Sequence, residues 1–280
     1  MESKLIAVVL GVFAMLSSAA SDFAETTSVE TDRLEELAVF NELNIDRGKL
    51  YDGFTVQDYI DSYKGYKEVS HTAFSDKYTL SVPLVNQYPD LPTGCELAAA
   101  VSVIEYNGNK IGLTDFTDRF VVCDENFYHD DEGILHGPDP AEVFVGDPYG
   151  WGYGCYPAVL AEYMDKAFKS LGVEYSSHAV TGLSEEELLE LVKGGVPVIV
   201  WASLDMKAFD YREPSVWRIY ETERELTWYK GSHTLVLCGA DKDAFYFMDP
   251  NDKTEIVAYG RGLFMRRYSE AGARAVIVKR

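Results

Sequence analysis

Residues 91–106 read LPTGCELAAAVSVIEY, and this stretch decides the fold. Its second half is almost wholly apolar, which predicts a helix over Gly94–Tyr106 that is buried on nearly all sides. Asn107-Gly108 follows and has the composition that ends a helix. We therefore expect a central buried helix around which the rest of the domain packs.

The first turn of this helix holds a cysteine. Thr93 and Glu96 have the spacing of a capping box, which makes Thr93 the N-cap and places Cys95 at the second helical position. Free backbone N–H groups and the helix dipole favour an anion there. A thiol at such a position tends to ionise below its ordinary pKa of about 8.5. The sequence therefore predicts Cys95 as a thiolate nucleophile, provided that a base and an oxyanion donor serve it.

Residues 1–20 have the pattern of a secretory signal peptide, with an early lysine, an apolar run at 5–16 and small residues at 17–20. The run is too short for a comfortable membrane span. We expect a secreted or cell-surface protein without a stable span after cleavage, the alternative being an uncleaved anchor. Residues 21–76 are expected to form an N-terminal extension, which either packs on the main domain or is removed as a propeptide. Residues 77–280 are expected to form one domain.

Charge and cysteine content narrow the function classes. A net charge of −21 disfavours nucleic-acid binding, because nothing in the chain could follow a phosphate backbone. The four cysteines contain no C-x-x-C pair, so we expect no zinc site. One disulfide among Cys123, Cys155 and Cys238 would fit an oxidising compartment, although a buried small hydrophobe is the alternative for Cys238. The cluster of histidines and carboxylates at 129–136 could suggest a metal ion, but Asp124, Asn126 and Tyr128 do not fit a calcium loop, so we expect a solvated acidic loop.

The order of the predicted elements indicates the fold class. Helices are predicted over Leu113–Val122, Pro157–Leu171 and 185–193, the last with a capping box at Ser184, and strands over Tyr78–Leu84, Pro197–Trp201, His233–Gly239, Ala244–Met248 and Ala273–Lys279. A long glycine-rich stretch at 123–156 is interpreted as a functional loop beside the cleft. Helices come first and strands cluster late, which predicts an α+β fold with a largely antiparallel sheet.

A base for the cysteine is predicted on the late hairpin. His233 begins one strand and Asp249 ends its partner, and opposed residues of an antiparallel pair share a face. An odd-numbered loop, or a bulge, would bring the two residues directly opposite each other, whereas a two-residue loop would place them on opposite faces. We expect Asp249 to accept a hydrogen bond from one ring nitrogen of His233 and the other nitrogen to face the Cys95 sulfur.

An oxyanion donor is predicted just before the nucleophile. Gln87 lies eight residues before Cys95 on a proline-bounded loop. Its side-chain amide, together with the Cys95 backbone N–H, could hold a developing tetrahedral oxyanion. The alternative for Gln87 is a structural amide that satisfies loop backbone groups.

Several blocks resemble one known family. The run VPLVNQ at 82–87 and LPTGCE at 91–96 is similar to the nucleophile segment of the bacteriocin-processing (double-glycine leader) cysteine peptidases, and closer to their stand-alone, exported relatives in Gram-positive bacteria. Further matching blocks are FVGDP at 144–148 with GYG at 152–154, GVPVIVW at 195–201, SHT at 232–234 and MDP at 248–250. The resemblance spans residues 78–280.

The resemblance implies a papain-like fold, in which a helical part bearing the cysteine packs on a sheet bearing the histidine. It implies Cys95 as nucleophile, His233 as base, Asp249 as orienting residue and Gln87 in the oxyanion hole, with no cofactor. We therefore expect a hydrolase, a cysteine peptidase that acts on peptide or isopeptide bonds of a peptide or protein substrate. Two alternatives share the fold, namely a non-catalytic binding or adhesion module and a transglutaminase-like acyl transferase. The aromatic residues of 201–229 could line a substrate groove or complete a core.

Overall fold

The computed structural model describes residues 54–67, 70–72, 77–252, 254 and 256–280. The predicted signal peptide and most of the predicted extension therefore lie outside the described residues. Within the described residues, no helix is long and apolar enough to cross a membrane.

An eight-stranded sheet forms the centre of the unit that begins at residue 48, and every strand pair in it is antiparallel. The strand order is β1-β2-β12-β9-β15-β8, with β13 paired to β12 and β14 paired to β13. The bounds are β1 Ser70–Thr72, β2 Lys77–Thr79, β8 Ser176–Thr181, β9 Val198–Ser203, β12 Ser232–Ala240, β13 Ala244–Met248, β14 Val257–Gly260 and β15 Arg274–Lys279. The predicted α+β class with an antiparallel sheet is confirmed.

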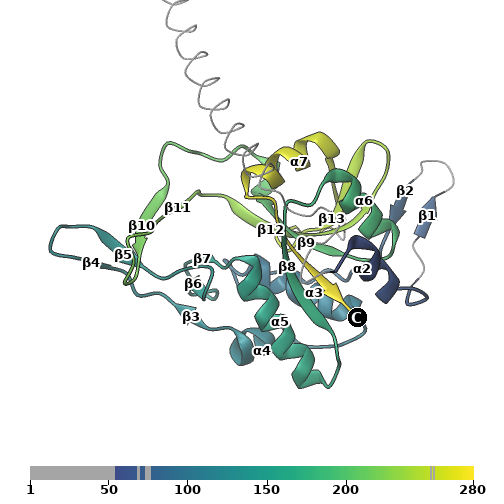
Figure 1. Ribbon diagram of the computed structural model, residues 1–280, viewed down its shortest axis with the longest axis horizontal. Coiled ribbons are helices and arrows are strands. Elements are labelled where there is room, and N and C mark those ends of the chain that lie inside the picture. The colour runs from purple at the N-terminus through teal and green to yellow at the C-terminus, as the bar shows by residue number, and fades with distance from the viewer. Residues whose placement is uncertain (1–53, 68–69, 73–76, 253, 255) are drawn as a thin grey trace, which may run out of the picture. The chain divides into compact units, whose positions relative to one another are not determined.

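Helices cover both faces of this sheet, which is why β9 is buried along its whole length (Figure 1). The helices are α2 Val56–Ser62, α3 Cys95–Tyr106, α4 Leu113–Phe120, α5 Pro157–Leu171, α6 Glu185–Lys193 and α7 Arg261–Glu270. On β12 and β9, α3 packs from one side, whereas α6 and α7 cover the other side in the view of Figure 1. All but one residue of α3 are buried, as its apolar sequence predicts.

The ends of the helices follow their sequence signals with one exception. The Ser184 side chain accepts from the Glu187 backbone, and the Glu187 side chain accepts from the Ser184 backbone, so the predicted capping box of α6 is present. Pro157 begins α5, and Gly172 ends it in the left-handed conformation that glycine favours. The exception is the start of α3, which belongs to the site below.

Part of the predicted extension is integral to the same unit. Helix α2 packs on β15 and α6, and its neighbourhood contributes Tyr59 and Tyr63 to the main core. Strand β1 pairs with β2 at the edge of the large sheet. The segment before residue 77 therefore adds buried surface to the domain.

Two smaller sheets occupy regions that the sequence analysis left without regular structure. One has the order β3-β6-β7, with bounds Cys123–Asp124, Phe144–Gly146 and Gly152–Gly154. The other, called the arm below, has the order β11-β10-β5-β4, with bounds Glu225–Trp228, Ser215–Ile219, Leu135–Gly137 and Tyr128–His129. Figure 1 shows the arm projecting from the side of the sheet opposite to α2.

The sequence and the structure differ at several elements. The strand predicted over Tyr78–Leu84 is regular only over Lys77–Thr79. Helix α4 ends at Phe120 rather than Val122. Helices α2 and α7 and strands β8 and β14 were not predicted, since none of these short elements has a clear apolar period in the sequence.

Candidate active site

Helix α3 begins one residue later than predicted and without a capping box. Its N-cap is Gly94, which makes no side-chain cap, and the Thr93 hydroxyl donates to the Asp147 carbonyl at 3.1 Å instead. Gly94 is required here because a Cβ would lie 2.7 Å from the Leu91 Cβ. The loop thus turns tightly into the helix, and Cys95 becomes its first residue. The capping-box prediction was wrong because backbone groups of the glycine-rich loop engage Thr93 first.

The Cys95 thiol is buried and contacts Glu96. Its Sγ donates to Glu96 Oε2 at 3.3 Å, and only 9 % of the residue is exposed. Burial, followed by the charge of Glu96, raises the pKa of the Cys95 thiol well above its ordinary value, against a lowering by the backbone N–H of Thr234. The expected lowering of this pKa is therefore wrong for this structure, because desolvation and a neighbouring carboxylate outweigh the helix dipole.

His233 and Asp249 form a buried pair. The His233 Nε2 lies 2.7 Å from Asp249 Oδ1, and the two residues are 4 % and 2 % exposed. The same carboxylate oxygen accepts the Asn251 backbone N–H at 2.9 Å, which fixes its orientation. The predicted contact between the imidazole and the carboxylate is present in the structure.

The register between the two strands differs from the prediction, but the shared face is kept. Val236 is opposite Met248. In this register Asp249 lies two positions short of the residue that would be directly opposite His233. A bulge between Leu237 and Gly239 corrects the phase that the turn alone would give. Because side chains alternate with a period of two, a shift of two positions leaves both groups on the same face. The expected bulge is therefore the element that lets them meet.

Strand β12 also brings the histidine to the nucleophile helix. It packs directly against α3, and the backbone N–H of Thr234, the residue after His233, is close enough to Cys95 to lower the pKa of its thiol. The His233 ring is near enough to Glu96 for its charge to lower the pKa of that carboxyl. Cys95, His233 and Asp249 thus belong to one locality, built from α3, β12 and the end of β13.

Gln87 links the loop before α3 to the loop after β13. Its Nε2 donates to the Pro92 carbonyl at 2.9 Å, and its backbone N–H donates to the Pro250 carbonyl at 2.9 Å. The side chain is 4 % exposed, and its Oε1 is buried without a hydrogen-bond partner. One amide N–H is therefore already committed to the nucleophile loop, which leaves the second for another acceptor.

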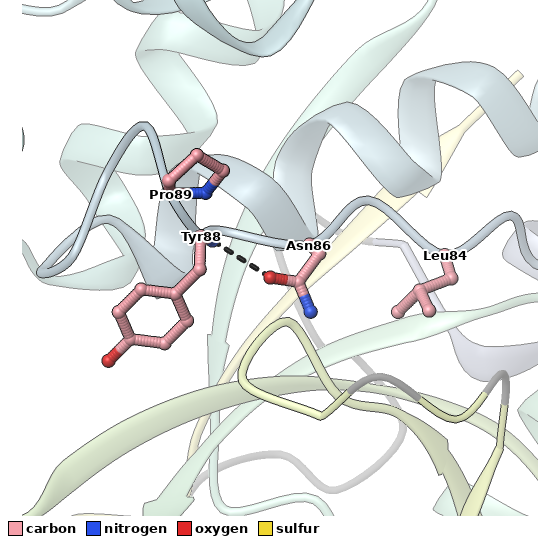
Figure 2. A pocket seen from close by; sticks show the side chains of 4 residues that line it. All are labelled: Leu84, Asn86, Tyr88 and Pro89. Atoms are coloured by element: carbon pink, nitrogen blue, oxygen red, sulfur yellow. Dashed lines mark hydrogen bonds between the residues drawn. The ribbon is translucent and has the colours of Figure 1, made fainter.

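A pocket lies along the segment that carries Gln87 (Figure 2), lined by Leu84, Asn86, Tyr88 and Pro89. Asn86 holds it together, since its Nδ2 donates to the Asp252 carbonyl at 2.6 Å and its Oδ1 accepts the Tyr88 backbone N–H at 2.8 Å.

Sequence reasoning missed Glu96 as a member of the site. Its Oε1 accepts the Cys155 backbone N–H at 3.3 Å while Oε2 accepts from Cys95, and the residue is 3 % exposed. The missed signal is a carboxylate on a helix that has no polar face. If such a carboxylate does not cap its helix, it needs hydrogen-bond donors inside the protein.

The remaining residues that the sequence singled out are cysteines, possible metal ligands and aromatic side chains. Each of the four cysteines, all within the described residues, is a free thiol. Across the described residues, no group of three histidine, cysteine or carboxylate side chains could hold a metal ion. Trp217 and Trp228 from the aromatic stretch are buried with Val145 of β6 in a small core between the arm and the three-stranded sheet, so these two do not line a groove.

Comparisons with known proteins identify a family and similar solved structures. The profile of the Peptidase_C39 like family matches residues 79–276. A solved structure of a protein from Bacillus anthracis, assigned as a C39-like peptidase, is similar with a TM-score of 0.62 and 26 % identity, over 73 % of this chain and 98 % of that chain. The peptidase domain of Streptococcus ComA, a bifunctional ABC transporter involved in quorum sensing, matches with a TM-score of 0.41 and 12 % identity, over 71 % of this chain and 98 % of that domain. No curated protein sequence matches significantly.

Proposed function

Because the chain belongs to the Peptidase_C39 like family, with the papain-like fold of its relatives, we propose that it is an exported cysteine peptidase with Cys95 as its nucleophile. The observation that carries the proposal is the buried pair of Asp249 with His233, which lies on the strand β12 that packs against α3. The apolar run and small residues of 1–20 support export through a signal peptide.

Catalysis proceeds in two half-reactions. The His233 ring takes the proton from the Cys95 sulfur, which attacks the substrate carbonyl carbon, and Asp249 holds the ring in the tautomer that can accept. The tetrahedral intermediate collapses as the C–N bond breaks, and the ring protonates the leaving amine. Water, deprotonated by the same ring, then cleaves the thioester and restores the thiol.

Gln87 is the proposed oxyanion donor. One N–H of its amide is fixed on the Pro92 carbonyl, which orients the second N–H, and the Cys95 backbone N–H at the first helical position is free of an intrahelical partner. Two such donors stabilise the charge that develops on the carbonyl oxygen, and removal of one typically costs about 10²–10³-fold in rate.

A non-catalytic binding module on the same fold is the alternative that one observation favours, namely the raised pKa of the Cys95 thiol. Alkylation of the thiols near pH 6 separates the two functions. A peptidase requires Cys95 to react much faster than Cys123 and to lose that advantage in His233→Ala, whereas equal reactivity supports the binding module.

The direct test is digestion of a peptide library by the chain without residues 1–20 and by its Cys95→Ala variant. Cleavage by the first and none by the second supports the proposal, and cleavage that survives in the variant overturns it. A parallel digestion with an added amine identifies acyl transfer, because the amine would then appear in the products in place of a free carboxylate.

A further inference from the structure

Glu96 is a buried acid in direct contact with the proposed nucleophile, and the reaction above does not use it. It follows Cys95 in α3, a helix whose other side chains are almost wholly apolar and buried. Its two oxygens have different partners, since Oε2 accepts from the Cys95 Sγ at 3.3 Å and Oε1 accepts from the Cys155 backbone N–H at 3.3 Å.

The backbone of β7 and Cys155 passes close to the Glu96 carboxyl and leaves space for it. Gly154 has a φ of +112°, a conformation that side-chain-bearing residues rarely adopt, and a Cβ at this position would overlap Glu96 Oε1. Thr93 and Gly152 lie alongside, with the Thr93 hydroxyl 3.2 Å from the position of a Cβ on Gly152. The glycine-rich strand β7 therefore leaves room for one carboxyl group and presents a backbone donor to it.

The groups that face Glu96 come from three elements. Cys95 lies on its own helix, Cys155 follows β7, and His233, paired with Asp249, lies on β12. Burial raises the pKa of the Glu96 carboxyl to about 7, against the lowering contributed by hydrogen bonds from Cys95 and Cys155 and by the His233 charge. A carboxylate and a thiolate in contact in a buried site repel strongly, so the two groups titrate as a coupled pair.

We propose that Glu96 is a positioning residue that controls when Cys95 can ionise, an inference that rests on the proposed nucleophilic role of Cys95. As a carboxylate, Glu96 accepts the Sγ–H and holds the thiol in its protonated form. As a carboxylic acid, it donates its own proton in a hydrogen bond to the sulfur and stabilises the thiolate. On ionisation the S–H bond breaks, its electron pair stays on sulfur, its proton moves to the His233 ring, and Glu96 keeps its proton.

This arrangement gives the thiol an unusual pH dependence. An ordinary thiol reacts faster as the pH rises, because more of it is thiolate. Cys95 loses its stabilising donor as the pH rises through the pKa of Glu96, so its reactivity falls or stays level between pH 6 and pH 8. In Glu96→Gln the amide oxygen accepts from Cys155 and the amide N–H donates to the sulfur at every pH, so the fall disappears.

The experiment measures the rate of iodoacetamide alkylation at each cysteine by peptide mass spectrometry between pH 5.5 and 8.5. Glu96→Gln is compared with the wild-type chain and with Glu105→Gln, a matched control on the same helix. We expect Cys95 in Glu96→Gln to react at least about tenfold faster than in the wild type at pH 8, and Glu105→Gln to follow the wild type. Cys123, which is exposed, serves as the internal reference thiol that accelerates with pH.

Two outcomes overturn the inference. One is a Cys95 profile in Glu96→Gln that superimposes on the wild type or lies below it at pH 8. The other, which needs no variant and decides the matter if Glu96→Gln does not fold, is a wild-type Cys95 rate that climbs with pH in parallel with Cys123. Because alkylation reports on the thiol alone, an altered profile without any peptide cleavage overturns the proposed function and leaves only the coupling between Glu96 and Cys95, whereas cleavage with an unaltered profile overturns the coupling and leaves the proposed function.

Discussion

Trp201 and Trp217 are equally buried, each at 1 % exposure, yet they stand in two regions built in different ways. Each donates its indole N–H to a backbone carbonyl, Trp201 to Cys155 at 3.3 Å and Trp217 to Pro138 at 2.8 Å. Trp201 lies on β9 within the large core shared by the eight-stranded sheet and its helices. Trp217 lies on β10 of the arm, in a cluster whose other buried members are Val145 and Trp228.

The difference shows that the burial of one side chain does not tell how much of the molecule's stability depends on it. In the main region, aliphatic and aromatic side chains from many elements share one core, so the loss of one is felt by the whole. Where the arm meets the three-stranded sheet, a few rings pack on one another, for instance Tyr153 of β7 on Trp217 of β10 with centroids 4.8 Å apart. Such a region can open while the main sheet stays folded.

The proposed chemistry belongs to the main region. His233 is opposite Ala202 on β9, and Cys95 begins a helix that packs on the same strands. A comparison of His233 with a histidine of the arm tests whether the proposed chemistry is confined to the main region. His233→Ala is expected to lower kcat/KM for peptide cleavage by about 10³-fold or more, because the base and its orienting contact are both lost. The measurement is cleavage kinetics with a library-derived peptide.

The matched control is His136→Ala in the arm. His136 lies on β5, stacks on Tyr128 and contacts Asp130 at 2.9 Å, so it resembles His233 in pairing with a carboxylate but lies outside the proposed site. We expect it to keep activity within about twofold. Equal losses of kcat/KM in the two variants would show that peptide cleavage depends on the arm as much as on the main region.

The same two regions divide what the sequence predicts from what it does not. Strong apolar runs foretell α3, α5, β12 and β13, and the motifs around Cys95, His233, Asp249 and Gln87 point to one locality, because these elements owe their form to local pattern. The arm strands β4, β5, β10 and β11 have no such pattern. Their pairing, including a parallel contact between Arg218 and His136, depends on segments 82 residues apart in the chain, since 218 − 136 = 82.

Within the site, the failure is instructive in another way. Thr93 and Glu96 have capping-box spacing, but Thr93 donates to Asp147 and Glu96 turns inward to Cys95 and Cys155. The spacing of two residues cannot reveal that Gly154 will approach Glu96 and that Cys155 will donate its backbone N–H to it. The rise in the Cys95 pKa comes from burial and from the inward-turned Glu96, so its direction could not be predicted from the helix position alone.

Trp201→Ala sharpens the comparison on the side of the main region. Its removal leaves a large cavity between β9 and the segment at Cys155, and the Cys155 carbonyl loses its donor. We expect the free energy of unfolding to fall by about 3–5 kcal/mol, which corresponds to a melting temperature lower by about 10 °C for a domain of this size. Urea denaturation followed by far-UV circular dichroism measures it, with Trp151→Ala, at a site 61 % exposed, as the control that should be nearly silent. A loss under about 1 kcal/mol would contradict a continuous core at this position.

Trp217→Ala tests the arm with the same chemical change and should have the smallest effect on the whole. The cavity forms in a small cluster, separate from the main core, against which the partly buried Phe127 and Tyr153 pack, so the arm opens at little cost to the main sheet. We expect the global free energy of unfolding to fall by less than about 2 kcal/mol, while limited proteolysis cuts faster within residues 207–230 and the alkylation rate of Cys95 stays unchanged. If Trp217→Ala instead lowers global stability as much as Trp201→Ala, the arm folds as one cooperative unit with the main sheet. Equal burial would then mean equal importance after all.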